Sequence, residues 1–212
     1  MIKVSYISHM GNDLSVINAA RVSFNKSSDA LDEKDVKLIN YLAEHEHMSP
    51  FEHCTLTVLI EVPLYIRSQI HRHRTFSYNE VSRRYTSEDL QFYLPSVDDI
   101  RQQSKSNRQA SDGSLDTETA ETVRTMMMHS HVAALAMYEN LIDAGVCREQ
   151  ARGVLPQNLM TKFYMTGNLR NFTHFLKLRS HGGAQKEVRE VAAQLELILL
   201  DKFPVSLNAL TT

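Results

Sequence analysis

The clearest alternation of apolar and polar residues along the chain lies at residues 54–62. Apolar side chains occupy every second position there, at Cys54, Leu56, Val58, Ile60 and Val62. A period of two predicts a strand with one strongly buried face, on which Cys54 behaves as a small hydrophobic residue. Pro63 closes this strand and can open a helix from Leu64, because proline is tolerated in the first turn of a helix.

Periodicity elsewhere predicts a chain that mixes helices and strands. Further strands are expected at 1–7, 91–94 and 159–166, and helices at 31–44, about 117–144, 148–154, 168–178 and 184–202. The polar stretch 101–119 has few apolar anchors and is predicted to be a mobile surface loop. No repeat and no domain boundary is visible. The sequence therefore predicts an α+β fold, with an antiparallel-type sheet and several packed helices, in a single domain spanning 1–212.

Composition narrows the class of protein. The chain has 212 residues, of which 42% are hydrophobic and 23% charged, as in ordinary globular proteins. No apolar stretch approaches the ~20 residues that span a bilayer, and the N-terminus lacks the apolar run of a secretory signal. The two cysteines, Cys54 and Cys147, form no CxxC pair. We therefore expect no membrane association and a reducing compartment: the cytoplasm, or the host cytoplasm if the source is viral.

Positive charge is concentrated between Arg67 and Arg84. This stretch holds five arginines and one glutamate, although the net charge of the chain is −2. A cluster of positive charge in an otherwise acidic chain favours recognition of a specific anion. Nucleic-acid binding is less favoured, because it usually requires the whole domain to be basic. The chain contains neither GxGxxG nor GxxxxGK[ST], so any nucleotide must be held without a Rossmann or P-loop cradle. A nucleic-acid module that stacks bases on Phe76, Tyr78 and Tyr85 is the rival hypothesis.

Two further clusters leave alternatives open. His45, His47 and His53 could bind a metal, as in a metal-dependent hydrolase, could cap a helix end, or could face a ligand. On the helix at 168–178, Arg170 and His174 are four positions apart and share a face. They either bind a ligand or form a cationic surface that complements the helix dipole. No histidine base adjoins Cys147 in the sequence, and Cys54 lies on the apolar face of a strand, so covalent thiolate catalysis is not indicated.

Residues 72–85, RHRTFSYNEVSRRY, carry a resemblance to a known family. They match the pattern RHRxxSxNExSxRY of the flavin-dependent thymidylate synthases at every fixed position. The segments HMSPFEH at 47–53, ARGVLP at 151–156 and residues 168–185 also resemble blocks of this family. The match covers roughly residues 1–205, and its segment 179–185 is richer in glycine than the family pattern.

The resemblance implies the family's non-Rossmann flavin fold and its reaction. Members convert dUMP to dTMP, taking a methylene group from methylenetetrahydrofolate and electrons from NADPH through FAD. The family is usually a homotetramer whose active sites are shared between subunits. The resemblance implies no metal and no nucleic acid.

Carried over position by position, the resemblance implies two sets of residues. The dUMP set is Gln69, Ile70, His71, Arg72, Glu80, Val81, Ser82, Arg83, Arg84, Arg152 and Arg179. The FAD set is Ser49, Arg72, His73, Arg74, Glu80, Asn168, Leu169, Arg170 and His174, with His47 as a flavin or folate contact.

Physical chemistry suggests roles within these sets. Paired guanidinium groups such as those of Arg84 and Arg152 would neutralise the phosphate dianion. Arg179 is the expected catalytic residue: it would stabilise an N3-deprotonated or enolate-like pyrimidine by its charge, since an arginine does not readily lose a proton. Ser82 has no evident base to activate it and is expected to form hydrogen bonds only.

Overall fold

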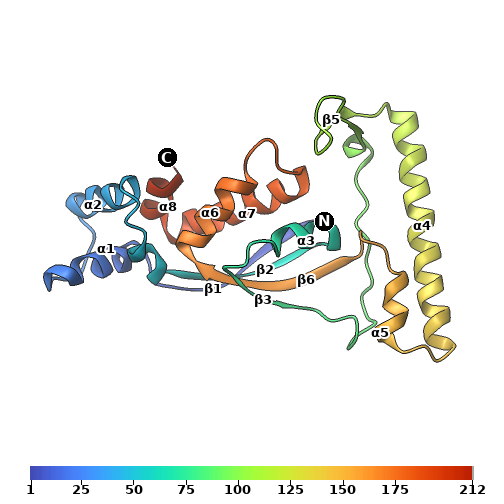
Figure 1. Ribbon diagram of the computed structural model, residues 1–212, viewed down its shortest axis with the longest axis horizontal. Coiled ribbons are helices and arrows are strands. Elements are labelled where there is room, and N and C mark those ends of the chain that lie inside the picture. Colours follow the sequence, from blue (N-terminus) through green and yellow to red (C-terminus); the bar gives the residue numbers. More distant parts are fainter. Residues whose placement is uncertain (212) are drawn as a thin grey trace. The chain divides into compact units, whose positions relative to one another are not determined.

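The structure is a computed structural model in which residues 1–211 are described (Figure 1). Its strands are β1 (Lys3–Met10), β2 (Thr55–Pro63), β3 (Ser77–Glu80), β4 (Arg101–Gln103), β5 (Ser111–Ser114) and β6 (Met160–Asn168). Its α-helices are α1 (Asp13–Arg21), α2 (Glu33–Glu44), α3 (Leu64–Ile70), α4 (Thr117–Asp143), α5 (Arg148–Ala151), α6 (Leu169–Arg179), α7 (Lys186–Lys202) and α8 (Pro204–Thr211). Short 3₁₀ helices are η1 (Val22–Phe24), η2 (Ser49–His53), η3 (Val97–Asp99) and η4 (Arg152–Val154). Among the described residues, no helix is long and apolar enough to cross a membrane.

Four of the strands form one sheet in the order β1-β2-β6-β3, and β4 pairs with β5 in a separate antiparallel hairpin. The amide of Leu169 donates to the carbonyl of Cys54 over 2.9 Å, and the amide of Leu64 donates to that of Leu159 over 3.0 Å. Residue numbers therefore fall along β6 as they rise along β2, which is the register of an antiparallel pair. The predicted α+β class, with antiparallel strands and packed helices, is confirmed.

The chain divides into two compact units. One comprises Met1, Glu61–Ser68 and Glu80–Lys162, and the other comprises Ile2–Ile60, Gln69–Asn79 and Phe163–Thr212. We call them the first and the second unit. The division passes along β2, β3 and β6, each of which has residues in both units. The expected single domain over 1–212 stays a prediction.

In the second unit, α6, α7 and α8 pack against one another, and α8 also packs against α2 (Figure 1). The core is made of apolar side chains with no exposed surface, among them Val16, Ile39, Phe172, Phe175, Val191 and Leu195. The chain ends are tied together by polar contacts: the Asp13 carboxylate accepts the backbone N–H groups of Val205 and Ser206 at the start of α8. The amide of Val4 donates to Gln194 of α7 over 2.9 Å.

In the first unit the longest helix, α4, has α5 packed against it near its C-terminal end (Figure 1). Its N-terminus is capped by the Asp116 side chain, which accepts the amide of Thr119. Gly145, two residues beyond the helix, has a φ of 86°, as expected for the glycine that ends a helix. Tyr138 is buried, whereas Met126, Val132 and Met137 leave more than half of their surface exposed.

The strand and helix predictions are mostly confirmed. β2 alternates as expected, with Leu56, Val58, Ile60 and Val62 buried. The segment 91–94 is not a strand: Phe92 makes only an isolated bridge to Leu159, since Pro95 removes the next backbone donor. The segment 101–119 is not a continuous loop. It forms the β4–β5 hairpin, inside which the Gln103 side chain donates to several backbone carbonyls, and α4 begins at Thr117.

Besides the β4–β5 hairpin, two α-helices and one strand have no counterpart in the sequence prediction. α1 begins with a capping box in which Asn12 and Ser15 bond each other's backbone, a local signal present in the sequence. α8 begins at Pro204, which favours the first helical position. β3 carries the polar run Ser77–Glu80, which has no apolar alternation to mark it as a strand.

Candidate functional site

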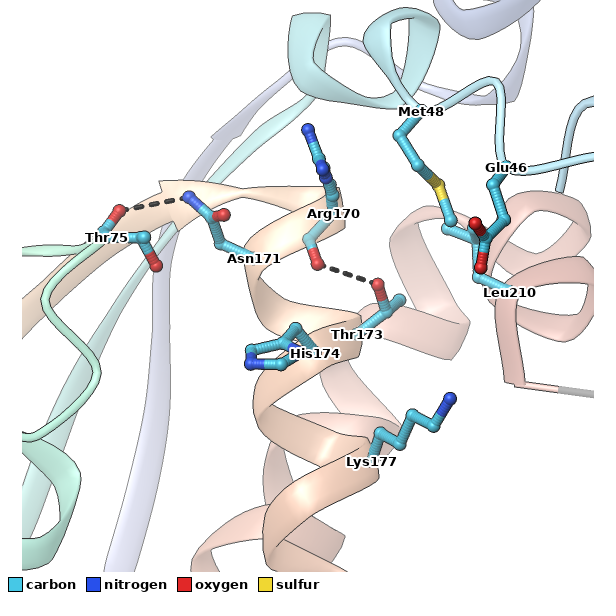
Figure 2. Close-up of a pocket in the computed structure, with 9 residues that line it drawn as sticks. All are labelled: Glu46, Met48, Thr75, Arg170, Asn171, Thr173, His174, Lys177 and Leu210. Atoms are coloured by element: carbon cyan, nitrogen blue, oxygen red, sulfur yellow. Dashed lines mark hydrogen bonds between the residues drawn. The ribbon is translucent and has the colours of Figure 1, made fainter.

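A cavity of about 610 Å³ opens along α6 in the second unit (Figure 2). Its lining residues are Glu46, Met48, Thr75, Arg170, Asn171, Thr173, His174, Lys177 and Leu210. Arg170, His174 and Lys177 follow one another along α6 at helical spacing, so the shared face predicted for the first two does border a cavity. The Lys177 ammonium has no hydrogen bond or ion pair within residues 1–211. This α6 cavity therefore offers up to three nitrogen-bearing side chains to an anion.

The start of α6 is fixed by residues of the implied FAD set. The Asn168 side chain accepts the amide of Asn171 over 2.9 Å and so caps the helix. Leu169 is buried, and its contact with Cys54 is through the backbone. Arg170 donates to the Glu52 carboxylate over 2.5 Å, and both side chains are partly exposed. Asn168 and Leu169 thus position the helix, whereas the Arg170 guanidinium reaches the cavity.

Arg179, the last residue of α6, lies in a polar cluster that we call the Arg179 cluster: Gln69, His73, Arg179 and Gln185. Arg179 donates from Nε to Nε2 of His73 over 2.9 Å and from Nη2 to the backbone carbonyl of Gln69 over 3.2 Å. The Gln69 side-chain amide donates to Oε1 of Gln185 over 2.5 Å. Three residues of the two implied sets are therefore brought together, and Gln185 joins them.

The signature segment around this cluster is partly packed and partly exposed. His71 lies against the Tyr78 ring with centroids 4.2 Å apart and meets the edge of Phe163 at 4.8 Å. Burial raises the pKa of the Tyr78 phenol, whose hydroxyl donates to the carbonyls of Ile70 and His73. Arg72 and Arg74 are exposed, and within the described chain no hydrogen bond or ion pair reaches either side chain. Both guanidinium groups are therefore available to a ligand.

In the first unit Glu80 lies between two donors. Its Oε1 accepts the Thr161 hydroxyl over 2.7 Å and is 3.1 Å from Nε of Arg67. The amide of Val81 donates to the Lys162 carbonyl. These contacts fix the orientation of a carboxylate that belongs to both implied sets.

Arg84 and Arg152 meet at the same residue of α5. Nη2 of Arg84 is 3.3 Å from the Glu149 carboxylate, and Nε of Arg152 donates to the Glu149 backbone carbonyl over 3.4 Å. Both arginines are exposed. The guanidinium groups of Arg84 and Arg152, which are predicted to share a phosphate, therefore both contact α5. Arg84 is already paired with the Glu149 carboxylate.

Arg83 and Ser82 have local structural contacts. Arg83 donates to the backbone carbonyls of Glu88 and Asp89, and burial lowers its pKa. The Ser82 hydroxyl oxygen accepts the amide of Arg84 over 3.2 Å, in keeping with a role in hydrogen bonding. The Arg83 guanidinium therefore holds the backbone at Glu88 and Asp89.

Among the histidines at 45–53, His45 makes a structural contact and His47 lies beside a cavity. His45 caps α2, with its ring Nδ1 2.9 Å from the Tyr41 carbonyl and its ring stacked on that of Tyr41. His47 and Ser49 border a second cavity of about 430 Å³ that Phe24 and Tyr41 also line. The sequence prediction assigned no function to Phe24 or Tyr41, whose exposure is visible only in the structure. No group of three or more metal-ligating side chains occurs in the described residues.

The two cysteines differ in environment. Cys54 is fully buried, its thiol lies 3.3 Å from the Asn12 carbonyl, and burial raises its pKa to about 11. Cys147 is exposed at the N-terminal cap of α5. Cys54 is therefore the small buried residue that the strand pattern predicted.

Comparison with known proteins identifies the family. The family described as thymidylate synthase complementing protein (Thy1) matches residues 5–205. The flavin-dependent thymidylate synthase of Thermus thermophilus is 39% identical over 204 residues, covering 96% of this chain and 73% of that protein. The enzyme of the same name from Thermotoga neapolitana is 38% identical over 206 residues, covering 97% of this chain and 89% of that protein.

A solved structure is similar over the whole chain. It is a UMP/dUMP methylase from Streptomyces cacaoi bound with 5-Br dUMP, with a TM-score of 0.90 and 34% identity, covering 100% of this chain and 95% of that one. The same methylase bound with 5-Br UMP gives a TM-score of 0.89 and 33% identity, covering 100% of this chain and 94% of that one. The resemblance found at residues 72–85 is thus confirmed over the full fold, and the chain belongs to the Thy1 family of flavin-dependent thymidylate synthases.

Proposed function

We propose that this protein methylates dUMP to dTMP, with methylenetetrahydrofolate as carbon donor and FAD reduced by NADPH as hydride donor. The observation that carries the proposal is the family match over residues 5–205, within which the signature at 72–85 is complete. The relatives are named for the same reaction, and the similar solved structure is a UMP/dUMP methylase.

The second unit has a donor set suited to FAD. The α6 cavity presents Arg170, His174 and Lys177, and the exposed Arg72 and Arg74 add two uncompensated charges. Such groups fit the pyrophosphate of a dinucleotide in a fold without a glycine-rich cradle. The proposed FAD set is Ser49, Arg72, His73, Arg74, Glu80, Asn168, Leu169, Arg170 and His174, with His47 as a flavin or folate contact. Bound FAD, once reduced by NADPH, supplies the hydride.

Arg84 and Arg152 are the proposed ligands of the dUMP phosphate. Arg84 already binds the oxyanion of Glu149, and Arg152 bonds the backbone of the same residue. A phosphate dianion carries more charge than a carboxylate and can accept bonds from both guanidinium groups, so it would displace the Glu149 carboxylate from Arg84. The rest of the proposed dUMP set is Gln69, Ile70, His71, Arg72, Glu80, Val81, Ser82, Arg83 and Arg179.

Arg179 is the proposed catalytic residue. Carbon 5 of uracil is a weak nucleophile until electron density is pushed into the ring, and a fixed positive charge beside the pyrimidine oxygens stabilises that density. One preorganised charge of this kind is worth about 3–4 kcal/mol. The Arg179 guanidinium is fixed at Nε and Nη2 by the protein, which supports such preorganisation.

We also propose a homotetramer with shared sites, acting in the cytoplasm. Exposed apolar residues on α4, including Met126, Val132 and Met137, support association with another copy of the chain. Size-exclusion chromatography with light scattering tests the mass of the assembly.

The direct test is spectroscopic. Purified protein loaded with FAD should show flavin absorbance that NADPH bleaches without oxygen, and should release dTMP when dUMP and methylenetetrahydrofolate are added. The same assay with UMP in place of dUMP measures the preference for the 2′-deoxy sugar. Absence of dTMP from a protein that holds FAD and is bleached by NADPH would overturn the proposed reaction. Near-normal turnover by Arg179→Ala would remove Arg179 from it.

A further inference from the structure

The guanidinium of Arg179 is held at two of its three nitrogens. Nε donates to His73 and Nη2 donates to the Gln69 carbonyl, while the part of the chain that the structure describes contains no partner for Nη1. Because a guanidinium is planar, two fixed bonds set the plane of the group and the direction of the third nitrogen. The protein thus leaves one edge of Arg179 in a defined orientation.

The bond to His73 determines the protonation state of the imidazole. The Nε–H of an arginine can only donate, so Nε2 of His73 must be the acceptor and the ring proton must lie on Nδ1. Burial, the Arg179 charge and His174 lower the pKa of His73 to about 4, so the ring is neutral at physiological pH. A neutral ring with its lone pair toward Nε is the form that supports this hydrogen bond.

His73 is itself held at its backbone and at its ring. Its backbone N–H donates to the Ile70 carbonyl over 3.0 Å, and its backbone carbonyl accepts the Tyr78 hydroxyl over 2.9 Å. The ring lies against Phe175 of α6 with centroids 4.7 Å apart. A side chain restrained at both backbone groups and at its ring can orient a partner without moving toward it.

We infer that His73 is a positioning residue for the proposed reaction: its Nε2 accepts Nε–H of Arg179 and aims the free edge of that guanidinium at the pyrimidine. This inference rests on the proposed function and assigns His73 a task beyond holding FAD. Gln185 supports this arrangement indirectly. It accepts a hydrogen bond from the side chain of Gln69, and the backbone carbonyl of Gln69 accepts from the Arg179 guanidinium.

The inference is tested with two substitutions of His73. His73→Gln keeps an acceptor near the position of Nε2, whereas His73→Leu removes the acceptor and keeps comparable bulk. At saturating FAD, His73→Leu should weaken dUMP binding about tenfold, the size of one hydrogen bond to a charged group. His73→Gln should stay within about threefold of the unchanged protein, as should His129→Gln, whose exposed ring lies on α4. Binding is measured by titrating dUMP against the flavin absorbance.

A second measurement does not depend on activity. In ¹⁵N NMR of the unchanged protein loaded with FAD, the His73 ring should show an unprotonated Nε2 and a protonated Nδ1 at pH 7. In an Arg179→Lys background, His73→Leu should cause little further loss of dUMP affinity, because the contact it removes is already absent.

The outcomes separate the two claims. If the unchanged protein holds FAD but does not bind dUMP, the proposed function fails. If it binds dUMP and His73→Leu lowers only FAD content while dUMP affinity at saturating FAD is unchanged, the inference about His73 fails and the proposed function stands. A ring protonated on Nε2 would also overturn the inference.

Discussion

The carboxylate of Asp13 accepts the backbone N–H of Ser206 over 2.8 Å, although 193 positions separate the two residues. A second bond from the amide of Val205 makes this side chain the cap of α8. Asp13 is buried, so its removal leaves two helix N–H groups without a partner in a region closed to water. Asp13→Ala should therefore lower the free energy of unfolding by about 1–3 kcal/mol, measured by urea denaturation.

The matched control is Asp112→Ala in the exposed hairpin strand β5, which should change stability by less than about 0.5 kcal/mol. Equal stability losses in the two variants would contradict the capping role of Asp13.

Gly167 lies against the ring of Phe76. A Cβ at this position would be 2.4 Å from Cδ1 of Phe76, which is buried in the second unit. Gly167→Ala should therefore displace the ring and cost about 1–3 kcal/mol of stability in thermal or urea unfolding. Gly113→Ala is the control, since nothing lies within 4 Å of its added Cβ. A Gly167→Ala protein that is as stable as the control would mean that the ring has room to move.

Thiol titration should separate the two cysteines. Burial raises the pKa of Cys54 to about 11, so almost no thiolate is present at pH 8, and the sulfur has no exposed surface. A disulfide reagent should modify one thiol per native chain, Cys147, and two after denaturation. In Cys147→Ser the native protein should be unreactive. Rapid modification of Cys54 in that variant would contradict its burial.

The pH dependence of stability should report on His73. Its pKa is about 4 in the folded protein, whereas an unfolded histidine titrates near 6.5. Between these values the unfolded chain binds the extra proton, so the free energy of unfolding falls as pH decreases from 6.5 to 4. His73→Gln removes this proton uptake. Relative to the unchanged protein it should therefore gain stability between pH 7 and pH 5, measured by urea unfolding at each pH. A constant difference over that range would argue against a depressed pKa.

Glu149 and Arg84 give a prediction about affinity. Because both side chains are exposed, their ion pair is worth at most about 1 kcal/mol, and Glu149→Gln should leave the unfolding free energy nearly unchanged. If dUMP phosphate competes with this carboxylate, Glu149→Gln should tighten dUMP binding by up to about fivefold. Arg84→Ala should weaken it at least tenfold, as expected for the loss of a charged phosphate ligand. Weaker binding in Glu149→Gln would mean that the carboxylate assists the substrate instead.

The parts of the fold with a strong local pattern were predictable from the sequence. β2 could be predicted because its buried face gives an apolar residue at every second position. α4 could be predicted because the helical pattern is long and Gly145 ends it. The β4–β5 hairpin was not, since its polar residues have no apolar alternation and its order depends on side-chain bonds to the backbone such as those of Gln103. β3 could not be predicted either, because its residues are polar and show no apolar alternation.

The candidate site shows the same division. Arg170 and His174 could be placed on one face from their spacing alone, because both lie on one helix. The bond from Arg179 to His73 joins residues 106 positions apart, and no local pattern encodes it. Arg84 and Glu149 likewise meet only through the fold. The family resemblance indicated which residues belong to the dUMP and FAD sets, and the structure showed which of these residues contact one another.

The clasp between the two ends of the chain bears on how the protein is made. A ribosome releases Val4 and Asp13 long before it has synthesised their partners Gln194 and Ser206, so these contacts cannot form until residue 206 has emerged. A nonsense mutation before the codon for Gln194 would therefore leave Val4 and Asp13 without these partners. Such a product would expose the apolar surface of β1, α2 and α6 that α7 and α8 normally cover, and exposed apolar surface favours aggregation.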